Sequence, residues 1–248
     1  MTHLSLFTGI GGLDLAAEWA GFETVGQCEW ADYPTKVLEK HWPGVPRWRD
    51  IRTLTKGSFY AKTGLRTVDV ISGGFPCQPF SVAGKRRGKA DDRYLWPEML
   101  RVIQELRPAW VVGENVSGLV RTALDEILSG LAAAGYAARA YSSEARDVGC
   151  LFRGQRITIV ATSNDRCTAV RRDGKFQADG ETAGRWRYFR GRKEEPYIWQ
   201  RWELESRPYG VAHGVPSRVD RLRCLGNAVV PAQFYPVFEA IAEVTKDA

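Results

Sequence analysis

Residues 68–81 constrain the fold of this chain more than any other stretch. Residues 68–71 form a short apolar run, VDVI, that is typical of a buried β-strand. The next ten residues, SGGFPCQPFS, contain two glycines and two prolines, which end the strand and predict a tight loop around Cys77. In α/β proteins, ligands and reacting groups gather where parallel strands end. The stretch therefore predicts an α/β fold with Cys77 at the carboxyl edge of its sheet.

The Cys77 thiol is a candidate nucleophile, because a thiol becomes nucleophilic near neutral pH more easily than other side chains. A structural cysteine buried in a Pro-Gly turn is the alternative. The five cysteines of the chain include no C-x-x-C pair, and its three histidines are scattered. We therefore expect neither a disulfide framework nor a metal site.

A strand, a glycine turn and a helix begin the chain. Residues 3–7 are typical of a buried strand, residues 8–12 (TGIGG) of a turn, and residues 13–20 of an amphipathic helix. This arrangement brings backbone N–H groups close to a nucleotide-like ligand. A plain turn would show the same pattern, so the ligand site and the turn both remain open at this point.

Two acidic residues are expected at the ends of the following strands. A strand over residues 23–29 ends in Glu29-Trp30, about 20 residues beyond the glycine turn, where an acid can accept hydrogen bonds from ribose hydroxyls. The Trp30 ring offers a flat face for an adenine. Asp50-Ile51 is expected to end a third strand, from which the acid could reach an adenine amino group. An ordinary exposed carboxylate at a strand end is the alternative.

The later segments continue the alternation of strands and helices. We expect strands over 110–113, 136–143 and 157–161 and helices over 94–106, 118–134 and 232–244. The strand at 110–113 should deliver Glu114 beside the Cys77 strand. There a carboxylate could protonate a ring nitrogen, and a helix cap near Ser117 is the alternative. Residues 226–227 (GN) should form a turn, after which the last helix returns to the main domain.

Two segments are rich in cations. Residues 84–93 should form a polar loop that could close over a phosphate backbone, unless it is an ordinary solvated loop. Residues 163–212 hold 11 lysines and arginines and 8 acidic residues. Their apolar residues show no sustained helix or strand periodicity. Within them, RWRYFRGR at 185–192 alternates cations with rings, which suits phosphate contacts and base stacking. A peripheral solvated insertion is the alternative to that binding role.

The totals are those of a globular protein. The chain has 248 residues, 44% hydrophobic and 26% charged. We expect one large domain, residues 1–162 and 213–248, and a small irregular domain, residues 163–212. No apolar run approaches the roughly 18 residues that span a membrane, and no secretory signal is present, so we expect a cytoplasmic protein without a membrane contact. The net charge of +6 is a modest bias toward polyanionic partners.

Taken together, these motifs resemble those of the DNA cytosine C5-methyltransferases, over residues 3–162 and 211–241. They occur in the family's order: F-x-G-x-G-G at 7–12, Glu29-Trp30, Asp50-Ile51, G-F-P-C-Q at 74–78, E-N-V at 114–116, Arg156, and G-N-x-V at 226–229. The resemblance implies a Rossmann-like methyltransferase domain, a mixed, mostly parallel sheet with helices on both faces, and a small target-recognition domain.

The resemblance also implies roles for individual residues. Cys77 resembles the thiolate that attacks C6 of a flipped-out cytosine, Glu114 the acid that contacts N3, and Arg156 the cation that supports the site. The S-adenosylmethionine pocket is implied for Phe7, Gly9, Gly11, Gly12, Glu29, Trp30, Asp50, Ile51, Pro76, Leu95, Asn227 and Val229. Contacts to duplex DNA are implied for Ser81, Lys85, Arg86, Arg87, Arg153, Arg185, Arg187, Arg190 and Arg192.

One motif departs from the family's pattern. The usual Q-x-R-x-R is F-R-G-Q-R at residues 152–156, so only Arg156 carries over directly and Arg153 is a candidate replacement. An RNA cytosine C5-methyltransferase with the same site is an alternative, and so is an inactive methyltransferase-like DNA-binding protein, which Gly154 favours. A nicotinamide oxidoreductase would leave the Pro-Cys-Gln loop unexplained. By resemblance, we expect a bacterial or phage-encoded monomer, with a restriction enzyme as a possible partner.

Overall fold

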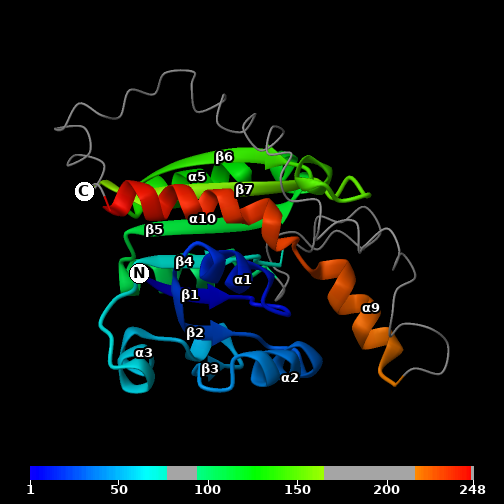
Figure 1. Ribbon diagram of the computed structural model, residues 1–248. Helices are drawn as coiled ribbons and strands as arrows, with labels where there is room; N and C mark the ends of the chain where they lie inside the picture. The colour runs from blue at the N-terminus through cyan, green and yellow to red at the C-terminus, as the bar shows by residue number, and fades with distance from the viewer. Residues whose placement is uncertain (77–93, 165–215, 247–248) are drawn as a thin grey trace.

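A β-sheet forms the middle layer of the protein (Figure 1). The computed structural model describes residues 1–76, 94–164 and 216–246, and within them the sheet has seven strands in the order β3-β2-β1-β4-β5-β7-β6. Strands β1 to β5 are parallel, whereas β7 runs antiparallel to both β5 and β6. The strands are β1 (Thr2–Leu6), β2 (Glu23–Cys28), β3 (Arg47–Trp48), β4 (Val70–Gly73), β5 (Trp110–Val116), β6 (Tyr136–Ser143) and β7 (Arg156–Ser163).

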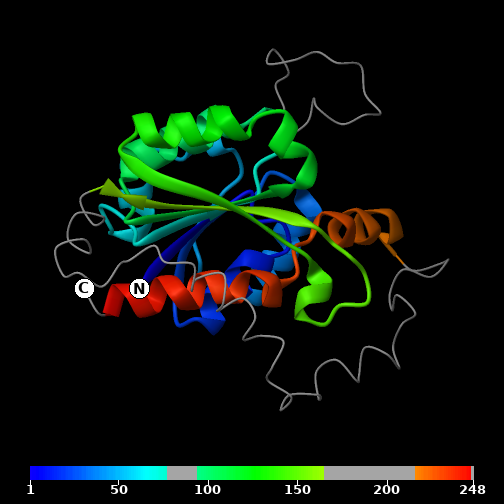
Figure 2. The same cartoon turned by 90° about the horizontal axis from the view of Figure 1, so that it is seen from above.

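Helices cover both faces of the sheet (Figure 2). On one face, Leu13 and Ala16 of α1 share a core cluster with Phe234 and Phe238 of α10. On the other face, α4 contacts both α3 and α5. The α-helices are α1 (Gly12–Trp19), α2 (Asp32–His41), α3 (Lys56–Thr63), α4 (Trp96–Leu106), α5 (Leu124–Ala133), α9 (Arg218–Asn227) and α10 (Pro231–Lys246), and the 3-10 helices are η1 (Ile51–Thr53), η3 (Ser117–Arg121) and η4 (Ala145–Val148). This Rossmann-like α/β fold confirms the predicted fold class.

Helix α4 shows how the sequence builds one of these layers. Its buried residues, Trp96, Met99, Val102, Ile103 and Leu106, recur every three or four positions and so form one apolar stripe. A proline in the first turn suits the start of the helix, because its fixed φ is already helical and its missing N–H has no partner there. The stripe packs into the same core cluster as β4 and β5.

The strand order reverses at the carboxyl ends of β1 and β4. These strands are neighbours, but the chain leaves β1 through α1 toward β2 and leaves β4 toward β5 on the opposite side. In open α/β sheets, ligands bind at such a reversal of strand order, because the two connections diverge there. The glycine turn after β1 and the loop that contains Cys77 both start at this point.

The predicted helix over 118–134 is wrong at residues 118–123. The structure has the 3-10 helix η3 there, and α5 begins only at Leu124. Leu119 is fully buried, and its carbonyl accepts hydrogen bonds from the N–H groups of both Thr122 and Ala123. Ala123 then takes an extended φ of −145° in its role as the N-cap of α5. The anchored Leu119 therefore ends the first turn before an α-helix can continue.

The strands agree with the predictions within a few residues, with two further differences. β5 continues to Val116 because β7 pairs with it as far as Val116↔Arg156. Glu114 therefore lies within a strand and is not a helix cap. The expected turn at residues 226–227 is also wrong, because both residues belong to the last turn of α9. The last helix does return to the main domain as expected, since α10 packs on α1.

Candidate active site

Glu114 lies near the carboxyl end of β5, directly beside the segment that leads to Cys77. The parallel pairing of β4 with β5 sets Gly73 opposite Gly113, so Gly74 and Glu114 are neighbours. A Cβ atom at Gly74 would lie only 2.6 Å from Oε2 of Glu114. The glycine at position 74 is thus required by the close approach of this carboxylate.

Arg156 is the ion-pair partner of Glu114. Its Nε lies 3.0 Å from Oε1 of Glu114, and the two side chains are 19% and 11% exposed. The pair forms because β7 is antiparallel to β5, which places Arg156 opposite Val116 on the same face of the sheet as Glu114. The structure therefore brings together two predicted catalytic residues that are 42 positions apart in the chain.

The carboxyl group of Glu114 titrates near neutral pH. Burial raises the pKa of Glu114 to about 7, and the neighbouring Arg156 charge lowers it, so burial dominates. A carboxyl group with this pKa exists in both protonation states at physiological pH. It can donate a proton or a hydrogen bond to a ring nitrogen and then take the proton back.

Asn115, the next residue of the E-N-V motif, holds the start of the loop that contains Cys77. Its Nδ2 donates a 2.9 Å hydrogen bond to the carbonyl of Phe75. Phe75 is buried, and its ring packs against Trp96 with the ring centroids 5.2 Å apart. Pro76 is the last residue described before the gap. Cys77 itself lies outside the described residues, as do Ser81, Lys85, Arg86, Arg87, Arg185, Arg187, Arg190 and Arg192.

The glycine turn after β1 is held by Glu29. The N–H of Gly9 donates to Oε2 of Glu29, and the N–H of Ala31 donates to Oε1, each at 2.8 Å. Gly9 and Gly11 have positive φ values, which glycine adopts without strain, and Phe7 has a φ of 52°, which is uncommon for a residue with a side chain. Burial raises the pKa of Glu29. The predicted residues of strands β1 and β2 thus meet in one structure.

The remaining predicted pocket residues are spread around the same edge of the sheet. Trp30 is 70% exposed. Asp50 caps η1, because its Oδ1 accepts a 2.9 Å hydrogen bond from the N–H of Arg52. Leu95 is the N-cap of α4. Val229 packs against the turn, since a Cβ atom at Gly12 would lie 2.6 Å from Cγ2 of Val229. Ile51 is buried at the start of η1, and Asn227 is exposed at the end of α9.

The departure from Q-x-R-x-R has a structural explanation. Gly154 has a φ of +49°, and a Cβ atom there would lie 2.7 Å from the Phe152 ring and 2.8 Å from Cβ of Ala145. This backbone therefore favours glycine at position 154. Arg153 ion-pairs with Glu144, its Nε lying 2.5 Å from Oε1. Within the described residues, the arginine that contacts Glu114 is Arg156.

Gln233 of α10 was not predicted from the sequence. Its side chain is buried, and Nε2 donates to the carbonyl and the Oγ of Ser143, each at 3.0 Å, and to the carbonyl of Gly154 at 3.3 Å. Gln233 thus joins the end of β6 to the segment just before Arg156. No local pattern marks this glutamine, because its partners are 79 or more residues away in the chain.

We expect Gln233→Ala to lower the free energy of unfolding by about 1–3 kcal/mol, because it removes a buried side-chain amide that donates to Ser143 and Gly154. Denaturant titration measures this change. Gln155→Ala is the matched control, since Gln155 donates to Ser142 on the same hairpin but at an exposed position. The control should change stability by less than about 0.5 kcal/mol. Equal losses of stability in the two variants would contradict the role of Gln233 in joining β6 to the segment before Arg156.

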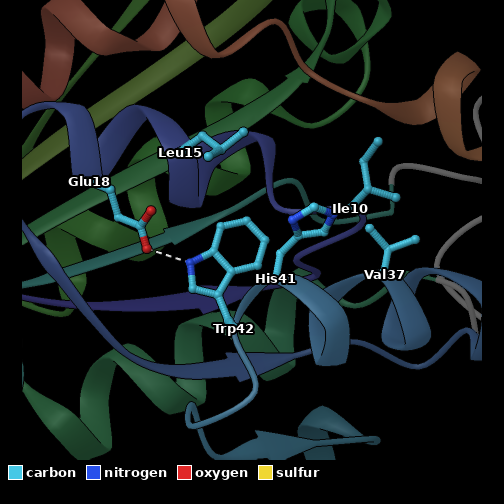
Figure 3. A pocket seen from close by; sticks show the side chains of 6 residues that line it. All are labelled: Ile10, Leu15, Glu18, Val37, His41 and Trp42. Atoms are coloured by element: carbon cyan, nitrogen blue, oxygen red, sulfur yellow. Dashed lines mark hydrogen bonds between the residues drawn. The ribbon is translucent and has the colours of Figure 1, made fainter.

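A cavity of about 330 Å³ opens between α1 and α2 (Figure 3). Its lining residues are Ile10, Leu15, Glu18, Val37, His41 and Trp42. None of them is a predicted catalytic or cofactor residue. The indole N–H of Trp42 donates to Glu18 across the cavity. A Cβ atom at Gly11 would lie 2.4 Å from the Trp42 ring, so this side chain packs under the glycine turn.

Within residues 1–76, 94–164 and 216–246, no group of three or more His, Cys, Asp or Glu side chains is arranged to hold a metal ion. None of the helices in these ranges is both long enough and apolar enough to cross a membrane.

Type II methyltransferases of bacteria are similar to this chain over part of their length. Type II methyltransferase M.HgiCII of Herpetosiphon aurantiacus is 36% identical over 141 residues, which cover 54% of this chain and 30% of that protein. M.NgoMIV of Neisseria gonorrhoeae is 32% identical over 168 residues, which cover 66% of this chain and 52% of that protein. The chain thus spans about a third to a half of the length of these relatives.

A solved structure shares the fold. The DNMT2 mutant structure of Spodoptera frugiperda superposes with a TM-score of 0.56 at 22% identity, over 66% of this chain and 50% of that chain. A family model described as C-5 cytosine-specific DNA methylase matches residues 1–193, which include Cys77, Glu114 and Arg156. Because that match covers most of the sequence, the chain belongs to the C-5 cytosine-specific DNA methylase family.

Proposed function

We propose that the protein transfers a methyl group from S-adenosylmethionine to C5 of a cytosine in duplex DNA. The observation that carries the proposal is the buried Glu114–Arg156 pair beside Gly74, at the start of the loop that contains Cys77. An acid with a pKa of about 7 and a thiol three residues beyond Gly74 are what activation of a cytosine ring needs. Membership of the family supports the same reading.

The carboxyl ends of β1, β2 and β3 fit an adenosyl sulfonium compound. Glu29 holds the turn at Gly9, Asp50 follows β3, and the exposed Trp30 ring offers a flat surface. No heavy atom lies within 4 Å of the position that a Cβ would take at Gly9, so the turn is open there. When bound, S-adenosylmethionine supplies an electrophilic methyl group. The residues of the chain bind and orient it.

In the proposed reaction, the Cys77 thiolate adds to C6 of cytosine. The S–C6 bond forms as Glu114 gives its proton to N3, so the ring electron pair moves to C5 without a build-up of charge. C5 would then take the methyl group that S-adenosylmethionine supplies, as the bond of that methyl group to the sulfonium sulfur breaks. Water takes the C5 proton, the Cys77 sulfur departs as thiolate, and N3 returns its proton to the Glu114 carboxylate, which restores the aromatic ring. Arg156 keeps Glu114 oriented, and its cation favours the carboxylate that remains after proton transfer.

The target base must leave the double helix, because C6 cannot be reached within the base stack. We propose that residues 163–212 form the small recognition domain and that residues 1–162 and 213–248 form the catalytic domain. Phosphate and base contacts are proposed for Ser81, Lys85, Arg86, Arg87, Arg153, Arg185, Arg187, Arg190 and Arg192. The name Type II methyltransferase of the relatives supports a role beside a restriction enzyme. We infer a cytoplasmic monomer.

We expect Gly9→Ala to weaken cofactor binding while the fold stays intact. The added methyl group enters the open space at the turn, and the positive φ adds a strain of about 1–2 kcal/mol. Calorimetry with S-adenosylhomocysteine measures the affinity. Gly21→Ala is the matched control, because Gly21 also has a positive φ and open space but ends α1 at the far edge of the sheet. If both variants bind equally well, the glycine turn is not part of the pocket.

The proposed function is tested by methylation of mixed-sequence duplex DNA with labelled S-adenosylmethionine, followed by mapping of the modified cytosines. We expect label at C5 of cytosines within one short sequence. Label in transfer RNA but not in duplex DNA, when the two compete, would show an RNA methyltransferase instead. Cofactor binding and DNA binding without any transfer would show an inactive relative.

A further inference from the structure

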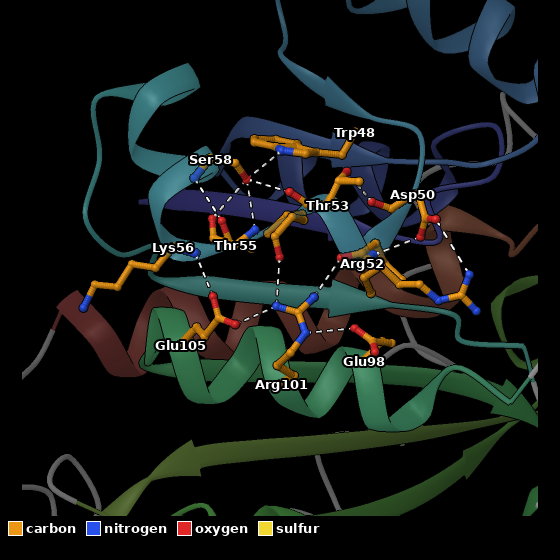
Figure 4. Close-up of polar contacts among 12 residues, drawn as sticks. Trp48, Asp50, Arg52, Thr53, Thr55, Lys56, Ser58, Glu98, Arg101 and Glu105 are labelled. Carbon is orange, nitrogen blue, oxygen red and sulfur yellow. Dashed lines mark hydrogen bonds and ion pairs between the residues drawn. The ribbon is translucent and has the colours of Figure 1, made fainter.

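Arg101 of α4 contacts the segment that follows β3 (Figure 4). One terminal nitrogen donates to the carbonyl of Ile51 at 2.9 Å, and the other donates to the carbonyl of Leu54 at 3.1 Å. The same guanidinium is fixed from its own helix by Glu98 at 2.8 Å and Glu105 at 2.6 Å. The planar fork of arginine allows all four contacts at once, which the single ammonium group of lysine cannot reproduce.

These contacts hold both sides of η1, since Ile51 is its first residue and Leu54 is its C-cap. The carbonyl of Ile51 also accepts from the N–H of Leu54 at 3.1 Å, so Arg101 is a second donor to it, and a cation is favoured near the carbonyl end of a helix. Glu105 adds a contact from α4 to the same segment, because its Oε2 accepts a 2.8 Å hydrogen bond from the N–H of Lys56 at the start of α3. Helix α4 thus holds the chain from Ile51 to Lys56 through one arginine and one glutamate.

Asp50 is the N-cap of η1, directly before the Ile51 carbonyl that accepts from Arg101. The carboxylate of Asp50 accepts from the N–H of Arg52, and the carbonyl of Asp50 accepts from both the N–H and the Oγ1 of Thr53. The whole turn is therefore one hydrogen-bonded unit. A shift of the Ile51 and Leu54 carbonyls would move the Asp50 carboxylate with them.

We infer that Arg101 is a positioning residue for the adenine end of the cofactor site. The inference rests on the proposed function, in which Asp50 accepts a hydrogen bond from the adenine amino group. Leu95, another proposed pocket residue, is the N-cap of the same helix. Arg101 thereby sets the distance between two walls of the pocket, η1 and the start of α4, without contact of its own to the cofactor.

The test compares two ligands that differ at the adenine amino group. Calorimetry measures binding of S-adenosylhomocysteine and of S-inosylhomocysteine, in which an oxygen replaces that amino group. Arg101→Met keeps the aliphatic stem and removes every donor, so it should weaken S-adenosylhomocysteine binding about tenfold and S-inosylhomocysteine binding about twofold or less. The preference of the chain for the amino compound should therefore fall. Arg101→Lys can still reach one carbonyl and should restore part of that preference.

Arg107→Met is the matched control. Arg107 lies at the end of the same helix and also donates from its guanidinium to a backbone carbonyl, but to that of Ala134 before β6. It should leave both affinities within about twofold. Thermal unfolding of each variant confirms that the chain is folded.

Several outcomes would overturn the inference. Unchanged S-adenosylhomocysteine binding by a folded Arg101→Met variant would do so. Equal losses for both ligands, or the same losses in Arg107→Met, would show a role in stability alone. If the unsubstituted chain binds S-adenosylhomocysteine, these failures concern Arg101 only. If it binds neither compound, the proposed function fails and the inference with it.

Discussion

Cys77→Ala is expected to abolish methyl transfer while cofactor binding survives. The thiolate acts in the chemical step, where it forms the bond to C6, and it contributes little to ground-state affinity. Loss of a nucleophile that works together with an acid should lower the rate by at least about 10⁴-fold. Transfer of labelled methyl groups to DNA measures the rate, and calorimetry with S-adenosylhomocysteine measures the affinity.

Cys150→Ala is the control for this experiment, because Cys150 is a free, partly exposed cysteine in the same protein and lies outside the proposed machinery. It should keep its activity. The unsubstituted chain should also form a covalent adduct with DNA that carries 5-fluorocytosine, since fluorine cannot leave as a proton does, and Cys77→Ala should form none. Methyl transfer above background in Cys77→Ala would show that Cys77 is not the nucleophile.

Glu114→Gln is expected to lower the rate about 10²–10⁴-fold, the usual contribution of a positioned general acid. A glutamine can donate a hydrogen bond to a base but has no proton to transfer. The control is Glu144→Gln, since Glu144 also forms ion pairs with arginines, but with Arg146 and Arg153 of the neighbouring hairpin and not with Arg156. That control should retain activity within about threefold. Similar losses in both variants would point to a general electrostatic effect of the carboxylates.

The pH dependence separates the acid role of Glu114 from a purely structural one. The pKa of Glu114 is raised to about 7 by burial, so the folded chain keeps this proton as the pH rises from 5 and loses it near 7. The rate at low substrate should therefore fall as the pH rises through about 7, and Glu114→Gln should lack that limb. A flat profile for the unsubstituted chain between pH 6 and 8 would contradict protonation by Glu114.

The same shift predicts a change in stability with pH. Because the folded state binds the proton more tightly than the unfolded state, this contribution to stability is complete below the ordinary pKa of a glutamate. It is lost as the pH rises through about 7. Unfolding measured from pH 5 to 8 should show a steeper decline for the unsubstituted chain than for Glu114→Gln. Parallel declines would show that other groups dominate in this range.

Much of the candidate site could be predicted because its signals are local. Two glycines and two prolines close together are a local signal for the end of a strand, so residues 72–81 alone predict the loop after β4. Glu29 closes the strand-like run of residues 23–29, so its place at a strand end is a local signal too. The helix predicted over 118–134 failed because Leu119 is anchored in a core that no local pattern describes.

The elements, the order of the motifs and the chemical identity of the reacting groups follow from the sequence alone, since each depends on neighbours within a few positions. Which groups meet depends on the tertiary structure. The antiparallel entry of β7 pairs Arg156 with Glu114, and burial at the sheet edge raises the Glu114 pKa. Packing of α4 and α10 brings Arg101 to η1 and Gln233 to Gly154. These contacts join segments that are tens of residues apart in the chain. Their energies depend on burial and strand order, which are properties of the whole fold and cannot be derived from any one stretch of sequence.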